Sequence, residues 1–365
     1  MLHAILSVSA YNLQCRHASQ NQEAVARKWA EIGSKYRMQA LDFLKTSAGD
    51  PLVATTNSED KELLAAMLCM VTIDVVSGDT RTCGIHLNGC ESLIKARKRA
   101  GVKISSKTEA LHRIFFYLRV MQDATELTCN AFQSPDHERG ERGRAGPDDF
   151  ETYLEPCEQL ADEGFDSASY ELIYSLPQSL LVLVHKTCKL LQRMNRADAV
   201  TFQRLLMPAC DQLEEEILDW PVEEEVAKLG GARMDKGNCV ILQHHMRAFH
   251  NAAIIFFCRN IRFMDRRHLQ QYVKAVIHHL DEIEKIKEKE MINAGPLLWP
   301  AFVAGEQAID SSTRAQLVGW FNRIERHGVA TAKLTRASLE ETWERAARNH
   351  SQVPISVLHT QLMLT

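Results

Sequence analysis

The segment 59–101 constrains the fold most, because two amphipathic helical patterns lie on either side of a short break. In the first pattern, apolar residues recur at the three- and four-residue intervals of one broad helix face: Leu63, Leu64, Met67, Leu68, Val71, Val75 and Val76. Ser77-Gly78-Asp79 predicts a helix end, since glycine readily adopts the left-handed conformation that closes many helices. Asp79 or Thr80 is expected to cap the second helix, and the basic run Lys95 to Arg99 suits its C-terminal end.

Helical spacing continues on both sides of this pair. Further helices are expected at 2–13, 21–44, 108–128, 169–194, 202–218, 238–263, 265–289, 311–327 and 335–348, with Pro177 kinking or splitting its helix. Polar and apolar residues alternate nowhere long enough to predict a sheet. We therefore expect an all-α fold of roughly ten or more packed helices, forming one domain over 1–365. The charged stretch 133–147, rich in Gly and Pro, is interpreted as an exposed, mobile loop.

Three of these patterns make specific predictions. In the opening helix Leu2, Ile5, Leu6, Ser9 and Leu13 share one face, and in the next Val25, Trp29, Ile32, Tyr36, Ala40 and Phe43 share one stripe. The run EIEKIKEKE at 282–290 is interpreted as a helix end with many solvated charges. Asp265 is expected to cap the helix that contains this run.

Composition excludes several classes of protein. The chain has 365 residues, 45% of them hydrophobic, which is enough for a large core, and its net charge of −4 gives no general reason to bind a polyanion. Ten scattered cysteines, several inside apolar helical runs, favour reduced and packed thiols in a cytosolic or nuclear protein. The first residues lack the basic start of a signal peptide, and the longest apolar runs are too short to cross a bilayer. We expect no membrane partner.

Candidate metal and catalytic groups are weak. Cys83 and Cys90 are seven residues apart, a spacing that also places two residues on one helix face, and no Cys-x-x-Cys occurs. The histidines His244, His245, His250, His278 and His279 lack the His-Glu-x-x-His pattern of zinc hydrolases and are expected to be satisfied structural residues. Asp148-Asp149-Phe150-Glu151 could suggest a magnesium site, but no second metal motif follows, so capping is the better interpretation. No catalytic, cofactor, metal or DNA-binding residue is therefore assigned, and no cofactor is expected.

Five motifs occur in a fixed order along the chain. They are LHAILSVSAYNL at 2–13, the leucine-rich helix with its Ser-Gly-Asp break and His86-Leu87-x-Gly89-x-x-x-Leu93-Ile94, FHNAAIIFFCRNI at 249–261, LLWPAFVAGEQA at 297–308, and the closing Trp320 and Trp343. Together they resemble the fungal-specific transcription factor domain, the long helical region that follows the zinc-cluster DNA-binding head of fungal regulators. The resemblance covers nearly the whole chain.

Two features depart from the family pattern. Cys83 stands three residues before His86, where the family usually has an aromatic residue, which suggests a repacked contact. The six clustered cysteines of a zinc-cluster head are absent from this chain. We therefore expect no sequence-specific DNA binding by this chain alone, so DNA would be reached only indirectly or through an N-terminal module.

The resemblance implies a function. It implies a nuclear regulatory domain that controls transcription of a metabolic or secondary-metabolite gene set, through homo- or heterodimerisation with other regulators or through a small-molecule effector. Two alternatives are an adaptor without a DNA-binding head and, from another class, an all-α enzyme of a biosynthetic pathway. Against the enzyme stands the lack of a recognisable nucleophile or metal constellation. His86 is expected to hydrogen-bond in the core or to hold the helix break.

The segment Pro296 to Glu306 contains the second recognisable motif. Pro300 is predicted to occupy the first position of a helix, where its missing N–H has no partner to lose. Trp299 and Phe302 are expected to point inward, and the small residues Ala301, Ala304 and Gly305 would allow a neighbouring helix to approach. Trp299 is interpreted as a core anchor, with the wall of an effector pocket as the alternative. Gly78 and Gly89 are expected to be structural, for a left-handed turn and for close helix packing.

Overall fold

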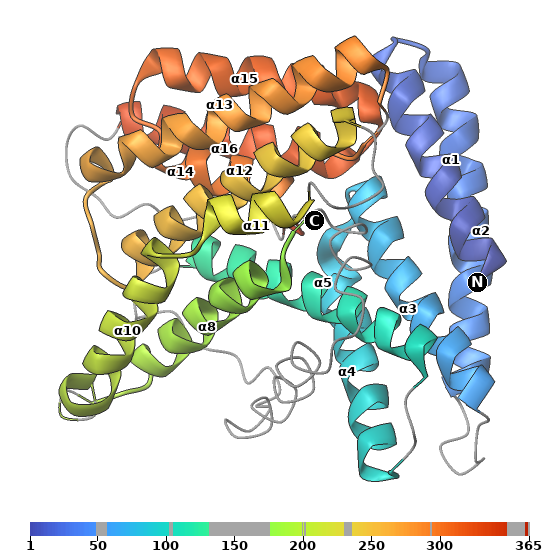
Figure 1. Cartoon of the computed structure of the whole chain (residues 1–365). Helices are drawn as coiled ribbons and strands as arrows, with labels where there is room; N and C mark the ends of the chain where they lie inside the picture. The colour runs from blue at the N-terminus through green and yellow to red at the C-terminus, as the bar shows by residue number, and fades with distance from the viewer. Residues whose placement is uncertain are drawn as a thin grey trace.

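The computed structural model describes residues 1–48, 57–101, 105–130, 176–198, 200, 202–229, 236–292, 294–348 and 362–363, and all regular structure in these ranges is helical (Figure 1). The elements are α1 (Leu2–Ser19), α2 (Glu23–Ala48), α3 (Asn57–Ser77), η1 (Thr80–Thr82), α4 (Cys83–Arg99), α5 (Ser106–Asn130), α8 (Gln178–Met194), η2 (Phe202–Leu206), α10 (Met207–Leu218), α11 (Val222–Leu229), α12 (Lys236–Asn260), α13 (Arg266–Glu290), α14 (Leu298–Gln307), α15 (Ser311–Ile324), η3 (Glu325–His327) and α16 (Ala330–Arg348). The all-α expectation is confirmed. The expected loop at 133–147 and the cluster at 148–151 lie outside the described residues.

Two apolar clusters hold most of the described helices together. One large apolar cluster runs from Leu64 in α3 to Leu339 and Trp343 in α16, and the C-terminal Leu362 and Met363 pack into it. A second cluster joins Ala4, Ala40, Leu44, Ala66, Met70 and Ile73, and it attaches the α1–α2 pair to α3. Figure 1 places α1 and α2 side by side at one edge of the molecule, drawn in blue. No helix among the described residues is long and apolar enough to cross a membrane.

α14 is buried along its whole length, from Leu298 to Gln307. A helix that is apolar on all sides must be covered on all sides, and α12, α13, α15, α16 and α5 all contact it. Gly305 permits the closest approach, because a Cβ there would lie 2.6 Å from Leu339 Cδ1 and 2.9 Å from Leu317 Cδ2. The Trp343 indole N–H donates to the Gly305 carbonyl at 3.0 Å, which fixes α16 against α14.

The start of α14 differs from the sequence expectation. The helix begins at Leu298 with Leu297 as its N-cap, so Pro300 is the third helical residue and not the first. Its position is still compatible with the helix, since none of the first-turn N–H groups has an intrahelical partner. The predicted inward direction of Trp299 and Phe302 is confirmed, with 1% and 2% of their surface exposed.

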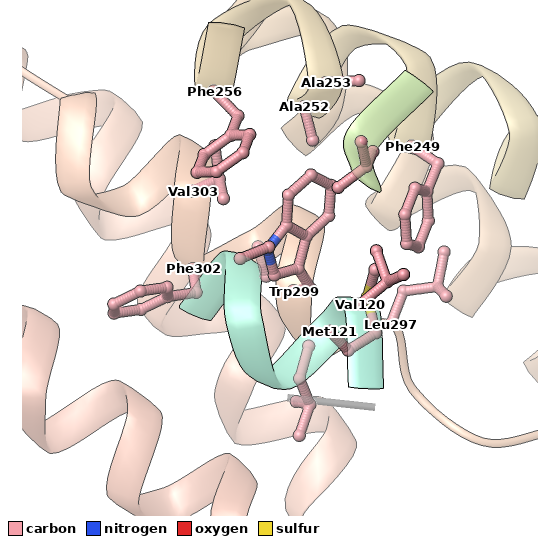
Figure 2. Packing of buried hydrophobic residues seen from close by; sticks show 14 of the residues in the cluster. Val120, Met121, Phe249, Ala252, Ala253, Phe256, Leu297, Trp299, Phe302 and Val303 are labelled. Atoms are coloured by element: carbon pink, nitrogen blue, oxygen red, sulfur yellow. The ribbon is translucent and has the colours of Figure 1, made fainter. Parts of the chain in front are cut away.

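Trp299 packs between α12 and α5 (Figure 2). Its ring stacks on Phe249 with centroids 5.0 Å apart and meets Phe256 edge to face at 5.8 Å. Val120 and Met121 of α5 and Leu297 approach it from other sides in Figure 2. The Trp299 indole Nε1 has no hydrogen-bond partner, so its contribution is packing area.

A buried ionic cluster holds the segment that leads into α14. Lys287 Nζ donates to Glu284 Oε1 at 2.7 Å and to the carbonyl of Gly295 at 3.2 Å, while Arg326 and His327 of η3 reach the other carboxylate oxygen at 3.2 and 3.4 Å. Burial alone would raise the pKa of Glu284, but the bonds from His327 and Lys287 lower it to about 2. The prediction that the charges at 282–290 are solvated is therefore wrong for Glu284 and Lys287. Both are buried in the fold, where Gly295 and η3 contact them.

Several helix boundaries differ from expectation. α1 continues to Ser19, α16 begins at Ala330, η2 is a π-helical turn before α10, and Val222–Leu229 forms α11. Pro177 is the N-cap of α8, so this helix starts after it. The prediction for Asp265 is confirmed, since its carboxylate accepts the Arg267 N–H at 2.9 Å.

The first prediction concerns Trp299. We expect Trp299→Ala to lower the free energy of unfolding by about 3–5 kcal/mol, because it leaves a cavity against two aromatic rings. Trp299→Phe should cost clearly less, and Phe263→Ala, at a residue that is 71% exposed, should cost at most about 0.5 kcal/mol. Chemical denaturation measures all three, and a Trp299→Ala variant as stable as its parent would contradict the role as core anchor.

The second prediction concerns Glu306, which is buried in α14. Burial raises the pKa of its carboxyl to about 7, and Arg266 acts in the opposite direction. Between about pH 4.3 and pH 7, the native state therefore keeps the Glu306 proton while the unfolded state releases it. The free energy of unfolding falls as the pH rises through this range. We expect Glu306→Gln to be more stable than the parent at pH 8 by about 1–3 kcal/mol, and by less than about 1 kcal/mol at pH 4.5.

Denaturation curves at the two pH values measure this difference. Glu340→Gln, at a half-buried surface position on α16 that is 3.9 Å from Arg336, provides the control and should change stability by less than about 0.5 kcal/mol at both pH values. A pH-independent effect of Glu306→Gln would show that the native carboxyl titrates normally.

Candidate functional site

The break between α3 and α4 forms a polar junction, which consists of Arg37, Asp74, Asp79 and Thr82. Arg37 reaches over from α2 and donates to Asp74 Oδ1 at 2.6 Å, to Asp79 Oδ2 at 3.2 Å and to Thr82 Oγ1 at 3.3 Å. The Thr82 hydroxyl in turn donates to Asp74 Oδ2 at 2.6 Å. The junction therefore ties α2 to the end of α3 and to η1.

The expected capping at this break is not what the structure contains. η1 comes between α3 and α4, and neither Asp79 nor Thr82 makes a side-chain cap. Asp79 instead accepts from Arg37 and, at 2.8 Å, from Arg81 Nε. Both guanidinium bonds are charge-assisted. The hydrogen bond from Arg81 is the main cause of the lowered pKa of Asp79.

Asp74 is the most buried member of the junction, and His86 lies beside it. Asp74 is fully buried, and burial raises its pKa to about 6 although Thr82 and Arg37 lower it. His86 Nε2 lies 4.0 Å from Asp74 Oδ2, too far for a hydrogen bond. Burial and the nearby Arg37 charge lower the pKa of His86 to about 4, so its ring is neutral near pH 7. His86 thus lines the junction without holding it by a direct bond.

Gly78 gives the junction its sharp turn. Its φ is +80°, as predicted, and a Cβ there would lie 3.0 Å from Ala330 Cβ in α16. Next to it, the Thr331 hydroxyl donates to the carbonyl of Val75 at 2.5 Å. Gly89 is less constrained, because a Cβ there would meet only the flexible Met67 side chain, at 3.0 Å from its Sδ.

A cavity of about 300 Å³ adjoins the junction. It lies between η1, the first turns of α4 and the second half of α5, and Leu362 and Met363 complete its wall. Its polar lining is contributed by Thr80, Arg81, Asn88, Arg119, Gln122, Asp123 and Glu126. η1 therefore belongs to both the junction and the cavity, through Thr80 and Arg81.

The cavity carries both signs of charge. Arg119 Nη1 donates to Asn88 Oδ1 at 2.8 Å, and Arg119 Nε lies 3.2 Å from Asp123 Oδ1. Gln122 Nε2 donates to Glu126 Oε1 at 2.9 Å, which leaves the buried Gln122 Oε1 without a partner. Burial raises the pKa of Asp123 to about 6, against the opposing effect of Arg119, so the carboxylate is ionised near pH 7. Such a lining suits a small polar molecule with both donor and acceptor groups.

The cysteine and histidine candidates have structural surroundings. Burial raises the pKa of Cys90 to about 12 and that of Cys83 further, so both stay protonated thiols. Within the described ranges, no group of three or more His, Cys, Asp or Glu side chains is arranged to hold a metal ion.

The histidines fall into three environments. His244 and His279 approach through their Nδ1 atoms at 3.0 Å, with His278 beside them, and His250 Nε2 contacts the Ile217 carbonyl at 2.7 Å. The expectation that all are satisfied is wrong for His245, because neither of its buried ring nitrogens has a partner. Burial lowers the pKa of His245 to about 3, so its ring is neutral in the core.

Sequence reasoning missed Arg37, Asp74, Arg119 and Gln122. Asp74 carries a signal that could have been noticed, since it interrupts an otherwise apolar helix just before the Ser-Gly-Asp break. Nothing in the sequence connects it to Arg37, 37 residues earlier, because that pairing depends on how α2 packs on α3.

Comparison with known proteins places the chain in a family. Residues 1–356 match the fungal specific transcription factor domain. The chain belongs to this family. It is also similar to the Arginine metabolism regulation protein II of Saccharomyces cerevisiae, with 24% identity over an alignment of 416 residues. That alignment covers 94% of this chain and 47% of the relative, so the chain spans about half the length of this relative. No solved structure matches the chain.

The matched residues 1–356 include the motifs on which the resemblance rests. They include the Leu-rich helix, the Ser-Gly-Asp break and the His86-Leu87-x-Gly89 segment, which form the junction and one wall of the cavity. The resemblance inferred from the sequence is confirmed.

The third prediction tests the turn at Gly78. We expect Gly78→Ala to lower the free energy of unfolding by about 1–2 kcal/mol, because its backbone is left-handed and Ala330 leaves no free space. Gly319→Ala is the matched control: it lies within α15, a Cβ there meets nothing within 4 Å, and it should be neutral or stabilising by up to about 1 kcal/mol. Equal effects of the two substitutions in denaturation experiments would contradict the special role of Gly78.

Proposed function

We propose that this chain is the regulatory domain of a nuclear transcriptional regulator that controls a metabolic or secondary-metabolite gene set. The membership of residues 1–356 in the fungal specific transcription factor domain family carries this proposal. The similarity to a regulator named for arginine metabolism favours a metabolic gene set. The domain extends over the full 365 residues, and it acts on transcription rather than as an enzyme.

The cavity beside η1 is the proposed effector site. Its lining of cationic, anionic and amide groups fits a small polar metabolite better than an apolar one, since an apolar ligand would shield these groups from water and offer no hydrogen bond in return. The amide side chains of Asn88 and Gln122 both line the cavity, where they can pair with such a ligand. Trp299, the alternative suggested by the sequence, lies in the packed core and does not line this cavity.

A physical connection runs from the cavity to the edge of the domain. Arg81 lines the cavity and bonds Asp79, Asp79 also bonds Arg37, and Arg37 belongs to α2. A ligand that accepts a hydrogen bond from Arg81 therefore competes with Asp79, the carboxylate that also binds Arg37 of α2. Effector occupancy would reach DNA through other regulators or a further module.

The fourth prediction tests both parts of the proposal. The chain is fused to a heterologous DNA-binding domain, and transcription of a reporter is measured in cells grown on different carbon and nitrogen sources. We expect reporter output to change with the nutrient. Gln122→Leu should abolish that response while thermal stability stays close to that of the parent, because it replaces a polar side chain of the cavity lining with an apolar one.

The matched control is Gln212→Leu. Gln212 donates to Glu216 at 2.9 Å one helical turn away, as Gln122 does to Glu126, but it lies on α10 outside the cavity. A fusion that never changes transcription would contradict the regulator. A Gln122→Leu fusion that responds like the parent would contradict the effector site alone.

A further inference from the structure

The outer face of α2 carries an apolar stripe that the fold leaves exposed. Val25, Ile32 and Phe43 are 39%, 37% and 38% exposed, and Trp29 and Tyr36 are half-buried. With Gln39, these six residues follow each other at alternating intervals of four and three, the spacing of a coiled-coil seam. The name α2 seam is used for these residues. Ala40, which the sequence placed on the same stripe, is instead buried.

α2 already packs on the domain through a different face. Ala26, Gly33 and Ala40, at intervals of seven, are buried, and a Cβ on Gly33 would lie 3.1 Å from the Tyr11 ring of α1. The Ser7 hydroxyl donates to the Gly33 carbonyl at 2.9 Å, which fixes this contact. The α2 seam is therefore not the surface that attaches α2 to the fold.

α1 extends the exposed apolar surface. His3 stacks on Tyr36 with ring centroids 6.0 Å apart, so α1 lies along one side of the α2 seam. Leu2 and Ile5, which the sequence placed on one face of this helix, are 66% and 49% exposed. Figure 1 places both helices at the edge of the molecule, where another protein can approach.

We propose that the α2 seam binds a second copy of this chain, with the two α2 helices antiparallel about a two-fold axis near Ser34. In that register Val25 faces Phe43 of the second copy, Ile32 faces Tyr36, and Trp29 faces Gln39. Each pair joins a smaller or polar side chain to a larger one, as a seam packed by knobs into holes requires. The same surface serves on both copies, so the assembly closes at two.

Charges beside the α2 seam favour the same register. Lys28, Lys35 and Asp42 follow each other at intervals of seven on its outer flank, and all three are exposed. The antiparallel arrangement places Lys28 of each copy next to Asp42 of the other, which gives two opposite-charge contacts. Near the axis it places Lys35 next to Lys35 of the second copy, which is unfavourable.

The available surface is large enough for a stable pair. α2 has 26 residues, which corresponds to a length of about 39 Å. With α1 beside it, the face is about 20 Å wide and therefore offers on the order of 800 Å² per copy, the size of a standard interface.

The first experiment measures the self-association of the whole chain by sedimentation equilibrium. We expect a dimer, and we expect Ile32→Glu to raise its dissociation constant by about tenfold or more. Met38→Glu is the control, because Met38 is 52% exposed on the same helix but lies about 200° around it from Tyr36. Circular dichroism checks that both variants stay folded. A monomeric parent, or equal effects of the two substitutions, would overturn the proposal.

The second experiment tests the register. Lys28→Asp and Asp42→Lys should each raise the dissociation constant by about tenfold, and the double variant should return it to within about threefold of the parent. Lys35→Gln should tighten the dimer severalfold, because it removes the like charges at the axis. Failure of the double variant to restore binding, or a weaker Lys35→Gln dimer, would exclude the antiparallel pair.

Discussion

The packing around α14 is the constraint on which the rest of this structure depends. Ten consecutive residues without an exposed face require neighbours on every side, and only small residues such as Ala301, Ala304 and Gly305 let those neighbours come close. The buried Glu284–Lys287 pair positions the segment before this helix, and the Trp343 N–H holds its last turn. A buried ion pair is retained only where further bonds satisfy both charges, and the Gly295 carbonyl, Arg326 and His327 supply them here.

The family signature turns the chain between α3 and α4, whereas α14 forms part of the core. Gly78, Asp74 and Thr82 turn the chain between α3 and α4 and bind Arg37 of α2. The same turn places Thr80 and Arg81 at the cavity. The signature thus connects α3 and α4 to the cavity and to α2 at the edge of the molecule. A displacement of η1 would be felt by α2, because Asp79 contacts both Arg81 and Arg37.

Some polar side chains are paired inside the domain, whereas others line the cavity. In the junction, Asp74 has its bonds from Arg37 and Thr82 inside the domain. At the cavity, Asn88, Arg119 and Gln122 line open space. His245 and the Trp299 indole lack partners, but both are enclosed by packed side chains. A polar side chain can bind a ligand only where space adjoins it, and the residues that line the cavity between α4 and α5 meet that condition.

The sequence by itself determined most of the helices, the left-handed turn at Gly78, the inward direction of Trp299 and Phe302, and the family, because each follows from local spacing, from ordered motifs or from a residue's own backbone preference. It could not determine what covers an apolar face. The stripes on α1 and α2 have the same periodicity as core helices, yet they are exposed, because Ala26, Gly33 and Ala40 pack more closely than the larger residues do. Nor could it distinguish Glu284 and Lys287 from solvated charges, or join Arg37 to Asp74. Those outcomes depend on which elements meet, and only the tertiary structure decided them.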